Sequence, residues 1–205
     1  AAVPALTQRL EDDDWRVRSA ACEALGQIGP SAAASAGAIV KALQEDRIWY
    51  SAAVALEHMG PQAAAKATPD LLRIAGDTKT NWNIRSNACL ALGGIRPLSE
   101  QTIAGLIQVL NDGPDILQSC VIRALADIGP PAVGPLTEAL DRDRLTAANA
   151  AKALGEIGPP AKAAAGKLVS KCRGATRDAI EPARALGRIG PDAAEVTAML
   201  EAIGS

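Results

Sequence analysis

The residue types that commonly carry out catalysis are sparse in this chain, and their spacing does not suit it. The 205 residues contain one histidine, His58, and four cysteines, Cys22, Cys89, Cys120 and Cys172. A single histidine excludes the H-E-x-x-H zinc motif, and the cysteines form no C-x-x-C pair of the kind that binds zinc. His58 has no serine or cysteine nucleophile at a recognisable spacing. We therefore expect no catalytic residue, no metal and no cofactor.

Two short segments have some features of ligand-binding motifs. Residues 158–167 run from glycine to lysine as in a P-loop, but the spacing is too long and Leu168 replaces the serine or threonine. Asp12, Asp13 and Asp14 form an acidic turn, for which a solvated loop is favoured over a cation site. Neither segment predicts a ligand.

The cysteines are expected to be free thiols that pack as small hydrophobic side chains, which favours a reducing compartment. No apolar run reaches the roughly 18 residues that a membrane span needs, and no signal-peptide pattern is visible. We therefore expect a cytoplasmic protein that does not bind membranes. The net charge of -2 argues against a nucleic-acid-binding domain.

The composition predicts closely packed helices. Hydrophobic residues make up 48% of the chain, yet phenylalanine is absent and aromatic residues reach only 2%. Alanine dominates the hydrophobic residues, and it is the best helix former. Since β-branched and aromatic residues do not alternate as they do in strands, we predict an all-α fold.

A seven-residue motif recurs six times along the chain. Its first copy is Ala-Leu-Gly-Gln-Ile-Gly-Pro at residues 24–30, and its sixth copy lies at residues 185–191. Its anchor leucines are spaced by 31, 36, 33, 29 and 32 residues; they are Leu25, Leu56, Leu92, Leu125, Leu154 and Leu186. A period in this range indicates a solenoid built from helical units.

Each part of the motif has a structural meaning. The Ala-Leu pair and the aliphatic residue three positions later form one apolar helix face. The following glycine, replaced once by Arg96, permits a left-handed turn that ends the helix, and proline then opens the next helix. Each unit thus has a first helix and a second helix. Pro182 is expected to shorten or kink the sixth second helix, with Glu181 as a cap.

Segments such as residues 17–29 resemble HEAT repeats, and they are most similar to the short HEAT-like repeats first noted in phycobiliprotein lyase subunits. The resemblance covers essentially the whole chain. It implies a right-handed α-α superhelix of about six helical hairpins plus a terminal helix, in one domain. The expected units are 1–29, 30–60, 61–96, 97–129, 130–158, 159–190 and a half unit, 191–205. The half unit leads us to expect part of a longer chain or of a hetero-complex.

Members of this family often carry an aspartate in the turn and an arginine early in the second helix, which form a ladder between units. Asp14 with Arg18 matches this pattern, and Asp77 with Arg85 is a looser match. The other units carry different residues at the arginine position, namely Trp49, Gln118, Ala147 and Ala179.

The candidate binding surface follows from the helical register. Residues 9, 6 and 2 positions before the anchor leucine and 2 positions after it face away from the core, Ser86 among them. The resemblance implies that this side of the second helices is concave and holds a partner. The expected contact residues are Arg47, Trp49, Tyr50, Val54, Leu90, Arg123, Lys152, Arg184 and Arg188. Trp15 and Trp82, ten residues before their anchors, form an expected aromatic rim.

Two interpretations of this surface stay open. The aromatic rings either anchor an interface or fill the turns between helices. The basic residues two positions before the anchor are either a solvated face or a site for an acidic peptide segment.

The favoured functional hypothesis is a scaffold that holds a partner protein or peptide in its concave groove. One alternative is a bilin lyase-like enzyme subunit, for which added bilin would show a shifted absorption band. Another is nucleic-acid binding, as in HEAT-like DNA glycosylases, which steep salt dependence would reveal. The missing His-Glu pairs argue against a resemblance to the HEAT-repeat iron hydroxylases that modify lysine.

Overall fold

The computed structural model describes residues 2–44, 48–95, 99–172 and 177–190. Every regular element in these ranges is an α-helix or a 3-10 helix, which confirms the all-α prediction. The expected half unit at 191–205 lies outside them. The chain divides into two compact units, residues 1–124 and residues 125–205, which are described separately below.

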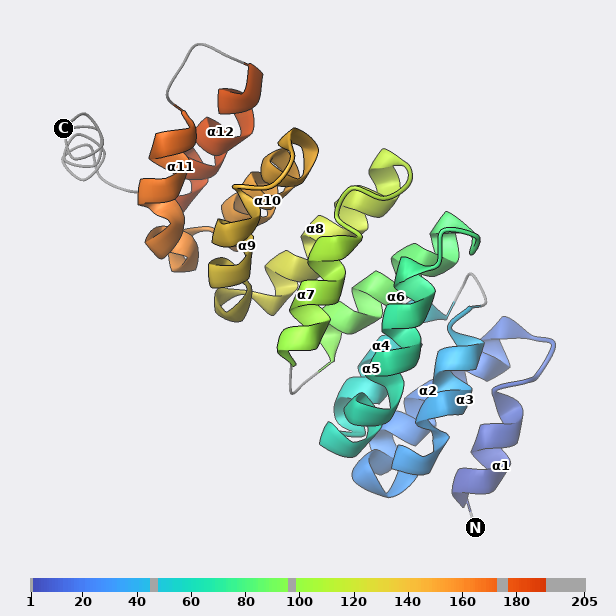
Figure 1. The fold of residues 1–205 in the computed structure, drawn as a ribbon. Coiled ribbons are helices and arrows are strands. Elements are labelled where there is room, and N and C mark those ends of the chain that lie inside the picture. Colours follow the sequence, from blue (N-terminus) through green and yellow to red (C-terminus); the bar gives the residue numbers. More distant parts are fainter. Residues whose placement is uncertain (1, 45–47, 96–98, 173–176, 191–205) are drawn as a thin grey trace. The chain divides into compact units, whose positions relative to one another are not determined.

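The described residues of the first unit form seven complete α-helices, and Figure 1 shows how they follow one another along the chain. They are α1 (Ala2–Arg9), α2 (Trp15–Ile28), α3 (Ala36–Ala42), α4 (Trp49–His58), α5 (Pro61–Gly76), α6 (Trp82–Gly94) and α7 (Glu100–Gln108), with a 3-10 helix at Gly29–Ser35. Helix α8 (Asp115–Ile128) runs from the first unit into the second.

In the described residues of the second unit, first helices of 7 residues alternate with longer second helices. This unit contains α9 (Val133–Ala139), α10 (Arg144–Ile157), α11 (Ala165–Lys171) and α12 (Ile180–Ile189). Its 3-10 helices are Pro130–Ala132, Pro159–Ala164 and Arg177–Ala179.

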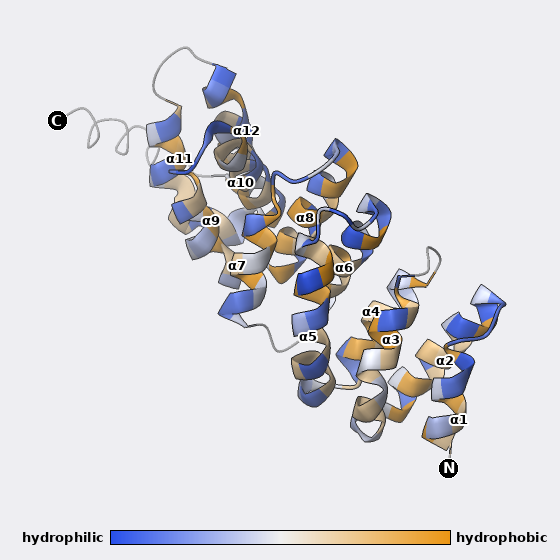
Figure 2. Ribbon diagram, turned by 45° about the vertical axis from the view of Figure 1, so that its right-hand side comes forward, coloured by the Kyte–Doolittle hydropathy of each residue, from blue (hydrophilic) through white to orange (hydrophobic). Residues whose placement is uncertain are grey.

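The helices form repeated hairpins, as the motif predicts. Within a helical repeat, the odd-numbered first helix packs against the even-numbered second helix that follows it. Such pairs are α1–α2, α3–α4, α5–α6, α9–α10 and α11–α12. Second helices also pack against one another, in α2–α4, α4–α6 and α10–α12. Figure 2 shows hydrophobic and hydrophilic residues on different sides of the same helices, as this packing requires.

The anchor leucines lie in the core. Leu25, Leu56, Leu92, Leu125 and Leu154 are fully buried, whereas Leu186 on α12 is half-buried. Many alanines surround them in the core, so the backbones of neighbouring helices approach closely. The prediction that the motif supplies the core side of each second helix is confirmed.

The motif glycines end their helices with a positive φ, but mostly not in the left-handed helical region. Gly190 has φ 72° and ψ 42°, as predicted. Gly29 and Gly158 instead have ψ values of -141° and -142°, and a 3-10 helix opened by proline follows each of them. The expected turn conformation is therefore wrong at these glycines, because the chain must re-enter a helix at once. Arg96 lies outside the described residues.

Helix α12 has 10 residues, whereas α2 and α10 have 14 each. Helix α4 also has 10 residues and contains no proline, so the length of α12 alone does not identify an effect of Pro182. Pro182 is the third residue of α12 and has no backbone N–H to donate. A regular α-helix therefore cannot continue from the preceding residues through Pro182. The expected cap is wrong: Glu181 lies inside α12, and its carboxylate accepts a hydrogen bond from Arg184 at 2.8 Å.

Candidate partner-binding surface

Large hydrophobic side chains that stay exposed lie on second helices. Within the described ranges there is one on each of α2, α4, α6, α8, α10 and α12, and none on an odd-numbered helix; they are Val17, Tyr50, Trp82, Ile116, Leu145 and Ile180. Exposed hydrophobic residues are ordinary when they are scattered. Their restriction to second helices distinguishes one side of each unit from the other.

The four most exposed of these side chains lie on the stripe that the register predicts. Ile116 and Leu145 lie nine residues before their anchors, and Tyr50 and Ile180 lie six residues before theirs. Positions three apart share a helix face. Tyr50 is 67% exposed, the largest value of the set, while Val17 and Trp82, which are off this stripe, are 36% and 37% exposed.

The aromatic residues of the first unit differ in their environments. Trp49 is half-buried, and its ring meets that of Tyr50 edge to face with centroids 5.7 Å apart. Trp15 is also half-buried, and the Arg16 guanidinium lies 5.1 Å from its ring centroid. Trp82 is exposed at the start of α6. Trp15 and Trp49 are thus partly covered by the surrounding structure, whereas Tyr50 and Trp82 are exposed.

The other candidate residues of the first unit form a less uniform row. Val54 and Leu90 are half-buried, and Arg123 is exposed. Ser86, expected on the same stripe, is buried, and its hydroxyl donates to the Trp82 carbonyl at 2.9 Å. Arg47 lies outside the described residues.

In the second unit the expected basic residues are all exposed on second helices. Lys152 lies on α10, and Arg184 and Arg188 lie on α12. Arg188 pairs with Glu156 of α10, which joins the two helices. Lys152 makes a weak contact of 3.4 Å with Asn149 on its own helix. Arg123, the remaining basic residue of the expected column, belongs to the first unit.

A buried arginine joins two successive hairpins of the first unit, but with a different partner from the expected one. The Arg85 side chain is 4% exposed, and its Nη2 donates to the Asp112 carboxylate at 2.9 Å. Its Nε donates to the Ala75 carbonyl at 2.8 Å. The expected Asp77–Arg85 pair is thus wrong. The Asp77 carboxylate instead accepts hydrogen bonds within its own turn, and these bonds, above all that from the Thr80 hydroxyl, lower its pKa.

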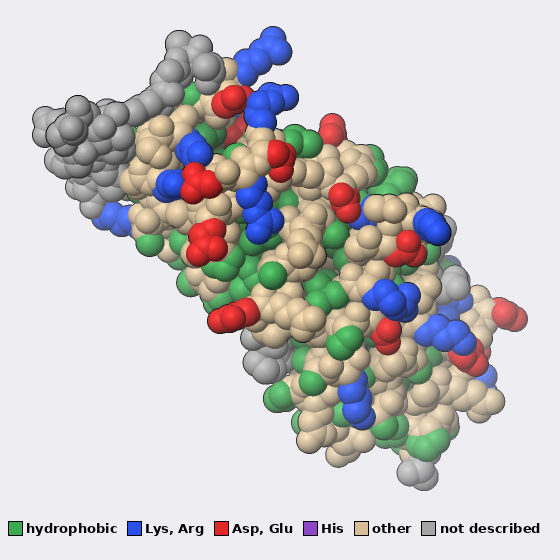
Figure 3. All heavy atoms as spheres, in the orientation of Figure 1, with side chains coloured by type: hydrophobic (Ala, Val, Ile, Leu, Met, Phe, Trp, Pro, Cys, Tyr) green, Lys and Arg blue, Asp and Glu red, His purple; other side chains and the backbone are tan. Residues whose placement is uncertain are grey.

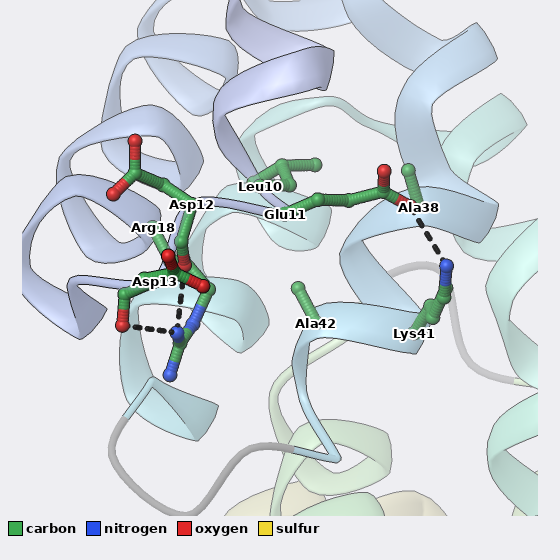
Figure 4. Close-up of a pocket in the computed structure, with 8 residues that line it drawn as sticks. All are labelled: Leu10, Glu11, Asp12, Asp13, Arg18, Ala38, Lys41 and Ala42. Atoms are coloured by element: carbon green, nitrogen blue, oxygen red, sulfur yellow. Dashed lines mark hydrogen bonds and ion pairs between the residues drawn. The ribbon is translucent and has the colours of Figure 1, made fainter.

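The acidic turn after α1 lines a cavity of about 500 Å³ (Figure 4). Its aspartates have structural roles: Asp12 accepts from the Asp14 N–H at 3.0 Å, and Asp14 caps α2 by accepting from the Arg16 N–H at 2.9 Å. Arg18 Nη1 donates to the carbonyls of Asp12 and Asp13. The expected Asp14–Arg18 rung is thus replaced in part by contacts to backbone. Two of the carboxylates on the rim are paired, Glu11 with Lys41 at 2.7 Å and Asp12 with Arg9 at 3.3 Å.

The cysteines are free, and two of them match the prediction of buried thiols. Cys22 and Cys89 are buried, whereas Cys120 and Cys172 are half-buried. Burial raises the pKa of the Cys22 and Cys89 thiols to about 12 in each case, because the thiolate would lose its hydration. The thiolate is the reactive form of cysteine, so Cys22 and Cys89 are poor nucleophiles.

We expect Cys22 and Cys89 to resist labelling of the native protein with dithionitrobenzoate at pH 8. Replacing either by alanine should leave the fast-reacting amplitude unchanged, whereas Cys120→Ala and Cys172→Ala should each reduce it. Stopped-flow absorbance of the four single variants measures this. A fast amplitude that falls in Cys22→Ala or Cys89→Ala would contradict the burial of these thiols.

The described part of the chain holds no group of three or more His, Cys, Asp or Glu residues that could bind a metal ion. In the same ranges no helix has the length and hydrophobicity needed to cross a membrane. His58 is an exposed residue at the end of α4.

Several solved structures are similar to this chain at low sequence identity. An engineered protein is 20% identical over 93% of this chain and 99% of its own, with a TM-score of 0.45. A designed armadillo repeat protein is 18% identical over 92% and 100%, with a TM-score of 0.42. Human deoxyhypusine hydroxylase is 21% identical over 100% and 90%, with a TM-score of 0.37. Likeness at this level carries no inference about activity.

A comparison with curated protein sequences finds no match. A family model for HEAT repeats, in contrast, matches residues 1–46, 36–117 and 103–181, which together span most of the chain. This match agrees with the hairpins, the buried anchor leucines and the Gly-Pro helix ends described above. The chain therefore belongs to the HEAT-repeat family.

Proposed function

We propose that this chain is a protein-binding scaffold whose partner lies along the exposed sides of the second helices. The observation that supports this proposal is the placement of the exposed large hydrophobic side chains, one on each even-numbered helix and none on an odd-numbered helix within the described residues. Removing apolar surface from water is favourable by roughly 25 cal/mol per Å². Stacked helical repeats present such residues as an extended surface, which suits a protein or peptide partner.

Site-specific photo-crosslinking tests this proposal. Benzoylphenylalanine is placed at Tyr50 or Leu145 on second helices and, as matched controls, at Arg73 or Glu138, which are exposed on the first helices α5 and α9. The full chain is irradiated in an extract of the organism that encodes it. We expect protein adducts from positions 50 and 145 and none from the two controls.

A second variant checks that any adduct depends on the hydrophobic surface. With the crosslinker at position 145, the change Ile180→Ser should reduce the adduct yield at least about fivefold, since contact residues at interface centres contribute more than about 1 kcal/mol each. Circular dichroism must show unchanged helicity. Adducts of equal yield from all four positions, or none from second helices, would contradict the proposed scaffold function.

A further inference from the structure

Helices α10 and α12 form a continuous surface in the second unit. They approach so closely that a Cβ built on Gly155 would lie 3.0 Å from the Cα of Ala185. Ion pairs join the helices near both ends: Arg144 of α10 lies 3.6 Å from Asp178, just before α12, and Arg188 of α12 pairs with Glu156. We call the surface that carries Leu145, Lys152, Arg177, Ile180 and Arg184 the α10–α12 face.

The charges on the α10–α12 face are unbalanced. Its acidic groups are all paired, Glu156 and Asp178 between the helices and Glu181 with Arg184 at 2.8 Å. Lys152 and Arg177 are exposed and make no ion pair with any described residue. The unpaired charges on this face are therefore positive. Figure 3 shows Lys and Arg side chains interspersed with Asp and Glu over the second unit.

The sequence from residue 125 to residue 190 has the same bias. Residues 125–190 contain ten Lys or Arg and seven Asp or Glu, whereas residues 1–124 contain eleven and thirteen. Residues 125–190 thus carry three more basic than acidic side chains, whereas residues 191–205 add three acidic ones. A positive patch favours negatively charged partners through the rate and the specificity of association.

Two exposed aliphatic side chains lie on the same face. Leu145 is 45% exposed on α10 and Ile180 is 47% exposed on α12. A purely electrostatic site would gain nothing from these side chains. Their presence beside unpaired cations favours a ligand that has both aliphatic and acidic groups.

This combination favours protein over nucleic acid as the ligand. Single-stranded nucleic acids bind through several phosphate contacts and through stacking of bases on aromatic rings. Residues 125–190 contain no Phe, Trp or Tyr. Aliphatic side chains have no preferred contact with a phosphate backbone, but they pack against the Leu, Ile or Val of a peptide.

We propose that the α10–α12 face binds an acidic segment of the partner protein, with Asp or Glu beside Lys152 and Arg177 and aliphatic residues against Leu145 and Ile180. This inference rests on the proposed scaffold function and names the chemistry of the segment that the second unit recognises.

Peptide selection on the full chain tests the proposal. A random dodecapeptide library is panned against immobilised protein, and the most enriched peptides are synthesised with a fluorophore for anisotropy titration. We expect the enriched peptides to have a net negative charge and at least two aliphatic residues. Their affinity should fall steeply as NaCl is raised, because the unpaired cations are exposed.

Three variants locate the site. Two double variants should each weaken binding at least about tenfold. Lys152→Glu/Arg177→Glu adds charge repulsion where attraction is lost. Leu145→Ser/Ile180→Ser removes the aliphatic contacts with the peptide. The matched control is Lys66→Glu/Lys79→Glu, which makes the same change of charge at exposed lysines of the first unit. The control should stay within about twofold of the original chain, since neither lysine belongs to the α10–α12 face. All variants must retain helicity.

Other outcomes overturn the proposal in distinguishable ways. Enriched peptides without an acidic bias, or peptides whose affinity is unchanged in Lys152→Glu/Arg177→Glu, would show that the α10–α12 face does not recognise acidic segments, while leaving the scaffold function to the crosslinking result. Failure to enrich any peptide would also overturn it. A labelled oligo-dT that binds more tightly than the best peptide, and is lost in the same variant, would assign the face to nucleic acid instead.

Discussion

Replacing Arg85 by alanine is expected to lower the free energy of unfolding by about 3 kcal/mol, since loss of one partner from a buried ion pair typically costs 3–5 kcal/mol. The Arg85 side chain is 4% exposed, but that of Asp112 is 37% exposed, which places the expected effect at the lower end of this range. The substitution removes donors to both the Ala75 carbonyl and the Asp112 carboxylate. Urea denaturation of the full chain, followed by circular dichroism, measures the change.

Arg73→Ala is the matched control for this prediction. Arg73 pairs with Asp70 at 3.4 Å, but both side chains are more than half exposed. Exposed pairs contribute about 0–1 kcal/mol, so this variant should unfold at nearly the original urea concentration. A double-mutant cycle with Asp112→Ala separates the ion pair from the contact with Ala75. Equal effects of Arg85→Ala and Arg73→Ala would show that Arg85 does not stabilise the junction between hairpins.

The partner of Arg85 could not be predicted from the sequence pattern alone. The family pattern suggests an aspartate in the turn that precedes the arginine, which here is Asp77. The carboxylate of Asp77 is already used within its turn, where it accepts from the Lys79 N–H and the Thr80 hydroxyl. Asp112 lies 27 residues after Arg85, in the turn of the next hairpin, and only the packing of successive hairpins brings the two together.

The helices themselves were predictable because each repeat contains its own start and stop signals. Proline opens four of the following helices, and glycine with a positive φ precedes them at Gly29, Gly60, Gly129 and Gly158. These signals depend on a few adjacent residues and need no knowledge of tertiary structure. The 3-10 helices were not predicted, since they depend on how the chain returns to the next first helix.

The candidate surface was predicted more accurately at some positions than at others. Tyr50 and Ile180 are exposed, as their register six residues before the anchor predicts, yet Ser86 at the same register is buried. Register determines which side of a helix a residue faces, but the neighbouring second helices determine whether that side is covered. Ser86 tolerates burial because its hydroxyl donates to the Trp82 carbonyl one turn earlier on the same helix.

The repeat motif also allows neighbouring second helices to approach closely, which interpreting each repeat by itself does not reveal. No role is predicted from the sequence for the glycine directly after the anchor leucine, which is Gly26 in the first repeat and Gly93 in the third. A Cβ built on Gly26 would lie 2.9 Å from the Cα of Ala55, and one built on Gly93 would lie 2.8 Å from the Cα of Ala124. In both cases the alanine directly precedes the next anchor leucine. Glycine is therefore required where two second helices are in backbone contact.

Gly93→Ala is accordingly expected to destabilise the chain by about 1–3 kcal/mol, the usual cost of overpacking a core. The new Cβ would also lie 3.0 Å from the Ala124 carbonyl oxygen, so α6 and α8 would have to separate. Gly94→Ala is a stringent control, because the adjacent Gly94 has no atom within 4 Å of an added Cβ. Within a helix this replacement is neutral or stabilising by up to about 1 kcal/mol. Opposite signs for the two neighbours, measured by urea denaturation, would identify helix contact as the cause, because propensity alone predicts a gain for both. A gain in both variants would show that α6 and α8 do not approach as closely as the geometry at Gly93 requires.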